Sequence, residues 1–142
     1  MALAHDVDER QLHDLVEAVQ AEAPPAFELS ALPLTGSRGA LRYSVAPWTP
    51  IISLHQRLVA ASFACGLPPM KSSSRLRPHI GIGYCRTRIP ARPVQAVVKP
   101  LRSLPPVPLL IDRLDLVEMR REAAAYTWKM VRTVHLSLEG AR

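Results

Sequence analysis

The sequence predicts an α+β domain in which helices lie on antiparallel sheet. Stretches whose apolar residues repeat with the helical period alternate with stretches of period two. Strands that follow one another in the chain are joined by connections too short for a parallel crossover. The elements follow the order αββαβαββ, and a chain of 142 residues fits one domain over 1–142.

Three stretches have helical spacing, at 9–22, 51–64 and 92–103. Asp8 stands directly before the first and is expected to cap its amino terminus. Pro100 is expected to shorten or kink the third helix, because proline removes a backbone donor and clashes with the preceding turn.

Five stretches alternate between apolar and other residues, as strands do: 27–33, 40–46, 79–85, about 107–119 and 126–138. The last two are separated by the short segment 120–125. We therefore expect them to pair as an antiparallel hairpin.

The segment from Arg77 to Cys85 carries the strongest functional signal. Period-two alternation puts one set of side chains on one face, Ile80, Ile82 and Tyr84, and the other set on the opposite face, His79, Gly81, Gly83 and Cys85. The two glycines leave space beside the imidazole, which either another backbone or a ligand can fill. Two interpretations stay open: a histidine packed under a neighbouring element, and a histidine that faces a ligand.

Charge is distributed unevenly along the chain, whose net charge is +6. No Asp or Glu occurs from Leu29 to Ile111. The same stretch holds many cations: Arg38, Arg42, Arg57, Lys71, Arg75, Arg77, Arg86, Arg88, Arg92, Lys99 and Arg102. Such a field attracts phosphates, and arginine contacts them with two parallel hydrogen bonds. A G+C-rich coding sequence would give the same excess of Arg and Pro. The basic composition can therefore also reflect the base composition of the gene and no binding function.

Several classes of protein are excluded by composition. No apolar run approaches the roughly 18 residues of a membrane-spanning helix, and the amino terminus has no signal-peptide pattern. Cys65 and Cys85 have neither zinc-ligand spacing nor the number needed for a disulfide framework. Aromatic residues, 5% of the chain, are too few for a base-stacking platform. We expect a cytoplasmic protein without cofactor, metal or membrane partner; the sequence does not predict its oligomeric state.

Several short motifs occur in an order typical of one superfamily. They are His79-Ile80-Gly81-Ile82 with Arg77-Pro78 before it, Leu114-Asp115-Leu116-Val117, Tyr126-Thr127-Trp128 and Val134-His135-Leu136. This pattern, over roughly residues 9–138, resembles the 2H phosphoesterases, in particular their bacterial 2′-5′ RNA ligase-like branch. The family motif is His-x-Thr/Ser-x with x hydrophobic, and the segment at His79 fits three of its four positions.

The resemblance implies a fold of two lobes and a metal-free reaction on RNA or nucleotide 2′,3′-cyclic or 2′-5′ phosphodiesters. In the family, two histidines act as general acid and base, and a Ser or Thr hydroxyl two residues after each contacts the phosphoryl oxygens. Carried onto this chain, His79 is the catalytic residue, and Gly81 and Arg77 are substrate-contacting positions. Gly81 has no hydroxyl, which removes a contact that is worth a few kcal/mol at a buried site.

The first family motif has no counterpart in this sequence, because it would stand on a strand before residues 9–22. His5 lacks the alternating neighbours, and the literal match His135-Leu136-Ser137-Leu138 corresponds to the closing strand, so His135 is expected to be an exposed strand residue. Either a strand with the first histidine lies upstream of this sequence, which lacks it, or the chain is a degenerate member that keeps the fold without hydrolysis. The sequence therefore leaves three functions open: a phosphodiesterase, a phosphate-binding module without turnover, and a small basic structural protein.

Overall fold

The computed structural model describes residues 7–37, 39–85, 87, 90–122 and 125–139. The elements are α1 (Glu9–Glu22), β1 (Phe27–Ser37), β2 (Ala40–Ala46), α2 (Thr49–Ala64), the short 3₁₀ helix η1 (Ser73–Arg75), β3 (His79–Tyr84), α3 (Ala91–Leu101), β4 (Val107–Ile111), β5 (Arg113–Glu122) and β6 (Ala125–His135). The α+β class is confirmed. His5 lies outside the described residues.

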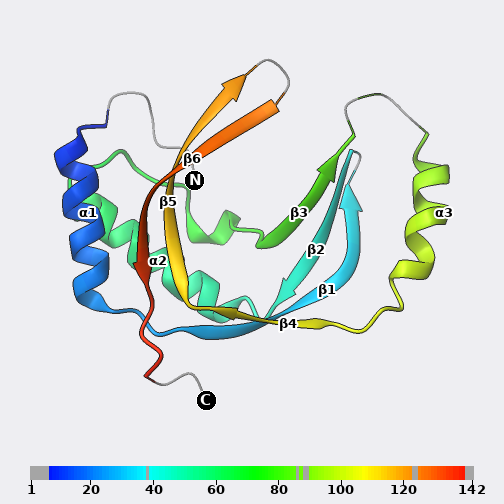
Figure 1. The fold of residues 1–142 in the computed structure, drawn as a ribbon, viewed down its shortest axis with the longest axis horizontal. Coiled ribbons are helices and arrows are strands. Elements are labelled where there is room, and N and C mark those ends of the chain that lie inside the picture. Colours follow the sequence, from blue (N-terminus) through cyan, green and yellow to red (C-terminus); the bar gives the residue numbers. More distant parts are fainter. Residues whose placement is uncertain (1–6, 38, 86, 88–89, 123–124, 140–142) are drawn as a thin grey trace.

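Two antiparallel sheets organise the fold (Figure 1). One has four strands in the order β3-β2-β1-β4, and the other is the β5–β6 pair. Helices α1 and α2 lie together beside β5 and β6, whereas α3 lies on the far flank, next to β1 (Figure 1). Strand β3, which begins at His79, is therefore an edge strand of the larger sheet.

The single strand predicted at 107–119 is wrong, because the chain changes sheets within it. Strand β4 pairs with β1, with Leu109 opposite Leu29, and β5 pairs with β6. The change occurs at Asp112, whose carbonyl oxygen accepts a hydrogen bond of 2.8 Å from the Leu136 N–H. Each half thus completes the ladder of a different sheet, which alternation along one strand does not reveal.

The antiparallel hairpin at the end of the chain is confirmed, with a shorter connection than predicted and with its last strand ending at His135 instead of residue 138. Strand β5 extends to Glu122 and β6 begins at Ala125, so most of the expected connection at 120–125 is strand. Cross-strand contacts extend the ladder: Arg121 pairs with Tyr126, and its guanidinium carbon lies 5.9 Å from the ring centroid.

The helices occur where they were predicted, with small shifts at their ends. Helix α2 begins at Thr49 instead of residue 51, since Pro50 is well suited to a first helical turn. Helix α3 ends at Leu101, one residue after Pro100. The amino terminus of α1 is capped as expected: the Asp8 side chain accepts a hydrogen bond from the Arg10 N–H at 3.0 Å.

The tightest packing joins α1 to α2 and the base of β6. Leu15 and Val19 of α1 are buried against Leu67 and Val134. A polar contact supports the same junction: Gln11 Nε2 donates hydrogen bonds to two carbonyl oxygens just beyond the end of α2, those of Cys65 and Gly66. This cluster holds the α1–α2 pair on the smaller sheet.

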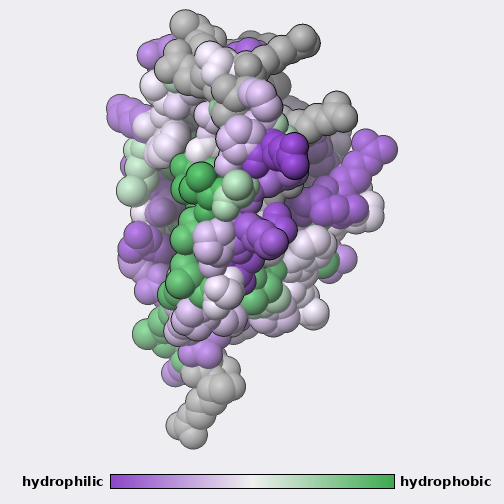
Figure 2. Space-filling model, turned by 90° about the vertical axis from the view of Figure 1, so that its right-hand side faces the viewer, coloured by the Kyte–Doolittle hydropathy of each residue, from purple (hydrophilic) through white to green (hydrophobic). Residues whose placement is uncertain are grey.

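The rest of the fold is open. The chain exposes 11020 Å², against about 7,300 Å² for a typical folded monomer of 15.7 kDa. All six residues of β3 are exposed, as is most of β5 and β6. On the flank formed by α3, apolar surface gathers in a band (Figure 2), and exposed apolar residues there are Val97, Leu101, Leu104 and Val107. Large parts of both sheets therefore lie in contact with solvent.

We expect Leu15→Ala to lower the free energy of unfolding by about 3 kcal/mol, because it leaves a cavity in the α1–α2–β6 cluster. Leu15 is only 5% exposed. Leu104→Ala is the matched control at 53% exposure and should cost less than about 0.5 kcal/mol. Urea denaturation followed by circular dichroism measures both values. Equal losses for the two variants would contradict the assignment of this cluster as the core.

Candidate functional site

The pairing of β2 with β3 brings a set of polar side chains onto one face of the larger sheet. His79 is opposite Ser44, and Gly81 is opposite Arg42. Arg42 is in turn opposite Thr35 of β1. Directly paired residues project to the same side of a sheet. We call this side the His79 face, defined by His79, Gly81, Ser44, Arg42 and Thr35.

The imidazole of His79 is exposed, not packed under a neighbouring element. Its Nδ1 lies 2.7 Å from the carbonyl oxygen of Arg77. A carbonyl oxygen only accepts hydrogen bonds, so the proton of the neutral ring must be on Nδ1. Nε2 then carries the lone pair and is available to accept a proton or to contact a ligand.

Two hydroxyls lie beside this histidine. The Oγ atoms of Thr35 and Ser44 are 3.2 Å apart, and Thr35 Oγ1 donates a longer hydrogen bond of 3.4 Å to the Arg42 carbonyl. Ser44 is the direct cross-strand neighbour of His79. The surface next to the imidazole is therefore formed by hydroxyl groups, which can donate to an anion.

The strict alternation predicted for β3 is wrong beyond Gly81, because the strand contains a bulge. Gly81 pairs with Arg42, but Gly83 pairs with the next residue of β2, Leu41, so Ile82 has no direct partner. From this point the two faces exchange. Tyr84 is consequently on the same side as Gly81, and its hydroxyl would lie 3.8 Å from a Cβ built at Gly81.

Acidic side chains are almost absent from the larger sheet. Glu28 is the one carboxylate in its four strands. It is four residues from Leu32, the β1 partner of Ser44, or roughly 13 Å along the strand. Of the basic residues named from the sequence, Arg42 is the one that lies in these four strands, and it has little competing negative charge on the same sheet, which favours an anionic ligand.

Arg77 lies beside His79 at the exposed entry to β3. Its Nη1 donates hydrogen bonds to the carbonyl oxygens of Ser74 and Leu76, at 3.1 and 2.8 Å. These bonds direct one edge of the guanidinium toward the η1 loop. The remaining donors of this side chain face solvent.

The other described histidines lie outside the larger sheet: His13 on α1, His55 on α2 and His135 on β6. His55 on α2 is half-buried and its Nδ1 is hydrogen-bonded to Ser73 Oγ at 2.8 Å, as expected of a structural histidine. His135 is exposed at the end of β6, opposite Arg113, which confirms the expectation for it. The free thiol of Cys85 donates to the Thr87 carbonyl, beyond the end of β3.

Sequence reasoning missed four members of this site: Thr35, Arg42, Ser44 and Tyr84. Alternation in 40–46 does put Arg42 and Ser44 on one face, which was a usable signal. Their position beside His79 depends on the strand register, however, and the position of Tyr84 depends on the bulge. Neither is encoded by residue spacing alone.

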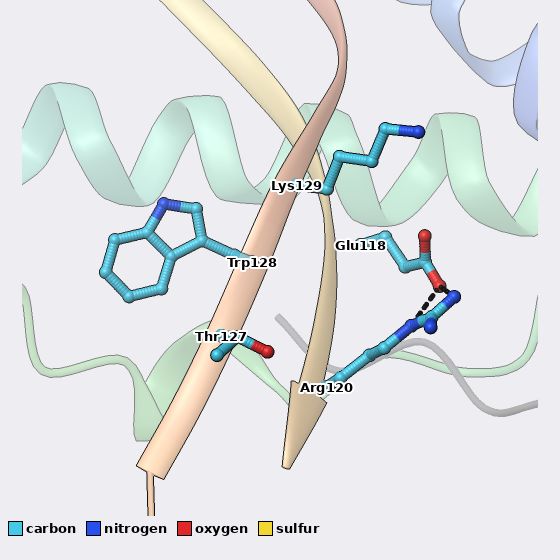
Figure 3. Close-up of a pocket in the computed structure, with 5 residues that line it drawn as sticks. All are labelled: Glu118, Arg120, Thr127, Trp128 and Lys129. Carbon is cyan, nitrogen blue, oxygen red and sulfur yellow. Dashed lines mark hydrogen bonds and ion pairs between the residues drawn. The ribbon is translucent and has the colours of Figure 1, made fainter. Parts of the chain in front are cut away.

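A hollow of about 330 Å³ lies at the other sheet, against β5 and β6 (Figure 3). Glu118 and Arg120 form an ion pair of 2.7 Å there, which raises the pKa of Arg120 through the hydrogen bond and charge of Glu118. Trp128 points to the opposite side of β6 (Figure 3). The arginine charge is thus paired with Glu118, while Lys129 also lines this hollow.

Within the described ranges, no group of three or more His, Cys, Asp or Glu side chains is arranged to hold a metal. None of the helices in that part of the chain has the length and apolarity needed to cross a membrane.

Several solved structures have the same fold, and one of them is described as a phosphoesterase; it aligns with a TM-score of 0.63 at 12% identity, covering 92% of this chain and 71% of that protein. Escherichia coli LigT in complex with 3′-AMP aligns with a TM-score of 0.64 at 13% identity, covering 96% of this chain and 74% of LigT. LigT in complex with NADP+ aligns at 0.59 and 14% identity, covering 93% and 71%. TT0787 of Thermus thermophilus aligns at 0.61 and 14% identity, covering 92% and 73%. The fold is therefore that of the LigT-like phosphoesterases.

The family is shown by the sequence itself. The model of the 2′-5′ RNA ligase superfamily matches residues 1–123. This chain belongs to that superfamily, in agreement with the 2H phosphoesterase resemblance of its His79 motif. No protein of curated function matches it significantly.

We expect the neutral ring of His79 to be the Nδ1–H tautomer, because only that form donates to the Arg77 carbonyl. Long-range ¹H–¹⁵N correlation spectra of the imidazoles distinguish the two ring nitrogens. His135, whose exposed imidazole has no hydrogen bond to another described group, is the control and should show the mixture typical of a ring in water. An Nε2–H tautomer at His79 would contradict the assignment.

Proposed function

We propose that this protein binds the phosphodiester at the end of an RNA or nucleotide on the His79 face and hydrolyses it with His79 in proton transfer. The observation that carries the proposal is the exposed imidazole whose Nδ1 is fixed by the Arg77 carbonyl. Membership of the 2′-5′ RNA ligase superfamily and the low acidity of the larger sheet support it. A 2′,3′-cyclic phosphate or a 2′-5′ linkage is the substrate that the family favours.

The reaction requires one water molecule per phosphodiester. Nε2 of His79 accepts a proton as the water oxygen forms a bond to phosphorus, and the bond from phosphorus to one ribose oxygen breaks. That ribose oxygen takes up a proton from solvent. Arg42, the hydroxyls of Ser44 and Thr35, and the backbone at Gly81 face the phosphoryl oxygens, where negative charge increases. Arg77 contributes its solvent-facing donors.

Nucleotides are the ligand class that the fold suggests. Two of the similar LigT structures hold 3′-AMP and NADP+. Both ligands combine a ribose with phosphate, which suits a face that offers a cation, hydroxyls and an imidazole. RNA as the larger substrate is our extension of this likeness.

A binding module without turnover is the second candidate, and two observations favour it. No other histidine occurs in the four strands of the larger sheet, so a second imidazole acid is not supplied there. Gly81 also lacks the hydroxyl that the family motif places at this position. In this reading the His79 face would hold the phosphodiester and release it unchanged.

We also propose a cytoplasmic location. Cys65 and Cys85 are both free thiols, as is usual for proteins of a reducing compartment.

We expect His79→Ala to reduce hydrolysis of adenosine 2′,3′-cyclic phosphate at least about 100-fold, because general acid–base catalysis contributes this much or more. Product formation by ³¹P NMR or chromatography measures the rate. His135→Ala, an exposed histidine of the other sheet, is the matched control and should keep the full rate. Equal rates for wild type and His79→Ala would contradict the enzymatic proposal. Tight binding with no turnover in the wild type would favour the binding module.

We expect the affinity for a short single-stranded RNA with a 2′,3′-cyclic end to fall steeply with salt, because phosphate contacts release counterions. Arg42→Gln should reduce the slope of log K against log salt by about 0.7, the value for one phosphate contact on a single strand. Arg10→Gln, on the exposed surface of α1, is the control and should leave the slope unchanged. Binding that does not depend on salt would exclude both phosphate-binding candidates and leave the structural protein.

A further inference from the structure

The bulge in β3 brings a hydroxyl to the place where the family motif loses one. Alternation along an uninterrupted strand would put Tyr84 on the side of Ile80, away from His79. Because Ile82 is the unpaired residue of the bulge, Tyr84 instead pairs with Ala40, which shares its side of β2 with Arg42. The phenol ring therefore extends over the His79 face.

The position of this hydroxyl can be compared directly with that of a motif hydroxyl. A Cβ built at Gly81 would have one neighbouring atom within 4 Å, the Tyr84 hydroxyl oxygen at 3.8 Å. A serine at position 81 would carry its oxygen one C–O bond beyond that Cβ. The phenol oxygen thus lies next to the site that a Ser hydroxyl would take.

The hydroxyl of Tyr84 is also available for a ligand. The residue is 74% exposed, and no hydrogen bond of its hydroxyl to another described group is found in the structure. A phenol O–H donates a hydrogen bond, and phosphoryl oxygens accept one. Arg42, opposite Gly81, supplies positive charge next to the same position.

We propose that Tyr84 replaces the motif hydroxyl missing at Gly81 and donates a hydrogen bond to a phosphoryl oxygen of the ligand bound at His79. The inference rests on the proposed function, since it concerns the same ligand. In this proposal, Gly81 lacks the hydroxyl of the family motif, and Tyr84, three residues further along the strand, supplies a hydroxyl donor in its place.

The test uses the whole chain with 3′-AMP as the probe and adenosine as the probe without phosphate, and isothermal titration calorimetry measures both dissociation constants. We expect Tyr84→Phe to weaken binding of 3′-AMP about 10-fold or more, the usual effect of losing one hydrogen bond to a charged group. Adenosine binding should not change. Tyr126→Phe removes an exposed phenol oxygen from the other sheet and is the matched control without effect. Far-UV circular dichroism confirms that each variant is folded.

The decisive variant adds Gly81→Ser to Tyr84→Phe. If Tyr84 stands in for the motif hydroxyl, the serine should restore most of the lost affinity for 3′-AMP. Full affinity of Tyr84→Phe, or a loss that Gly81→Ser does not recover, overturns the inference. His79→Ala separates this outcome from a failure of the proposed function: if it too leaves 3′-AMP binding unchanged, the His79 face is not the site at all.

Discussion

The register between β2 and β3 is the constraint on which the functional surface depends. It puts Ser44 beside the imidazole of His79 and Arg42 beside Gly81, and it places one unpaired residue, Ile82, between the two halves of β3. A shift by one residue would turn every one of these side chains to the opposite side of the sheet. The bulge is therefore part of the site in the same sense as the histidine.

The carboxylates of the chain are distributed unevenly between the two sheets. Acidic residues occur in α1 and in the β5–β6 pair, whereas the four-stranded sheet holds Glu28 alone. On β5, Glu118 neutralises Arg120 at short range. The strands of the larger sheet supply no second carboxylate, and their one cation, Arg42, lies opposite Gly81 on the His79 face.

Much of the fold could be predicted from the sequence, and part of the site could not. Apolar period and capping residues predicted α1 to its ends, and alternation located β2 and the start of β3. The same reasoning failed at Asp112, because the two halves of one apolar run serve different sheets. It failed again at Tyr84, because a bulge reverses the faces of a strand without changing its composition. Local patterns report which residues prefer a strand; pairing with a distant strand decides where their side chains go.

Residue types alone were enough to single out His79, since two glycines follow it in a stretch of the chain that is rich in Arg and has no Asp or Glu. Residue types could not identify Thr35 or Ser44 as members of the site, because both are common polar strand residues. Only the pairing of β1, β2 and β3 places them near the imidazole. The resemblance of His79-Ile80-Gly81-Ile82 to a family motif supplied the chemistry, and the match of the superfamily model confirmed the family.

The hydrogen bond between the His79 ring and the Arg77 carbonyl connects the histidine to helix α2. Arg77 is tied to the carbonyls of Ser74 and Leu76, and η1 is tied to α2 through Ser73 and His55. The orientation of the His79 ring therefore depends on α2, through the hydrogen bonds of His55 with Ser73 and of Arg77 with the loop that contains η1. In the reaction proposed above, changes in this serine-rich stretch would alter proton transfer by His79 without removing any group that contacts the phosphate.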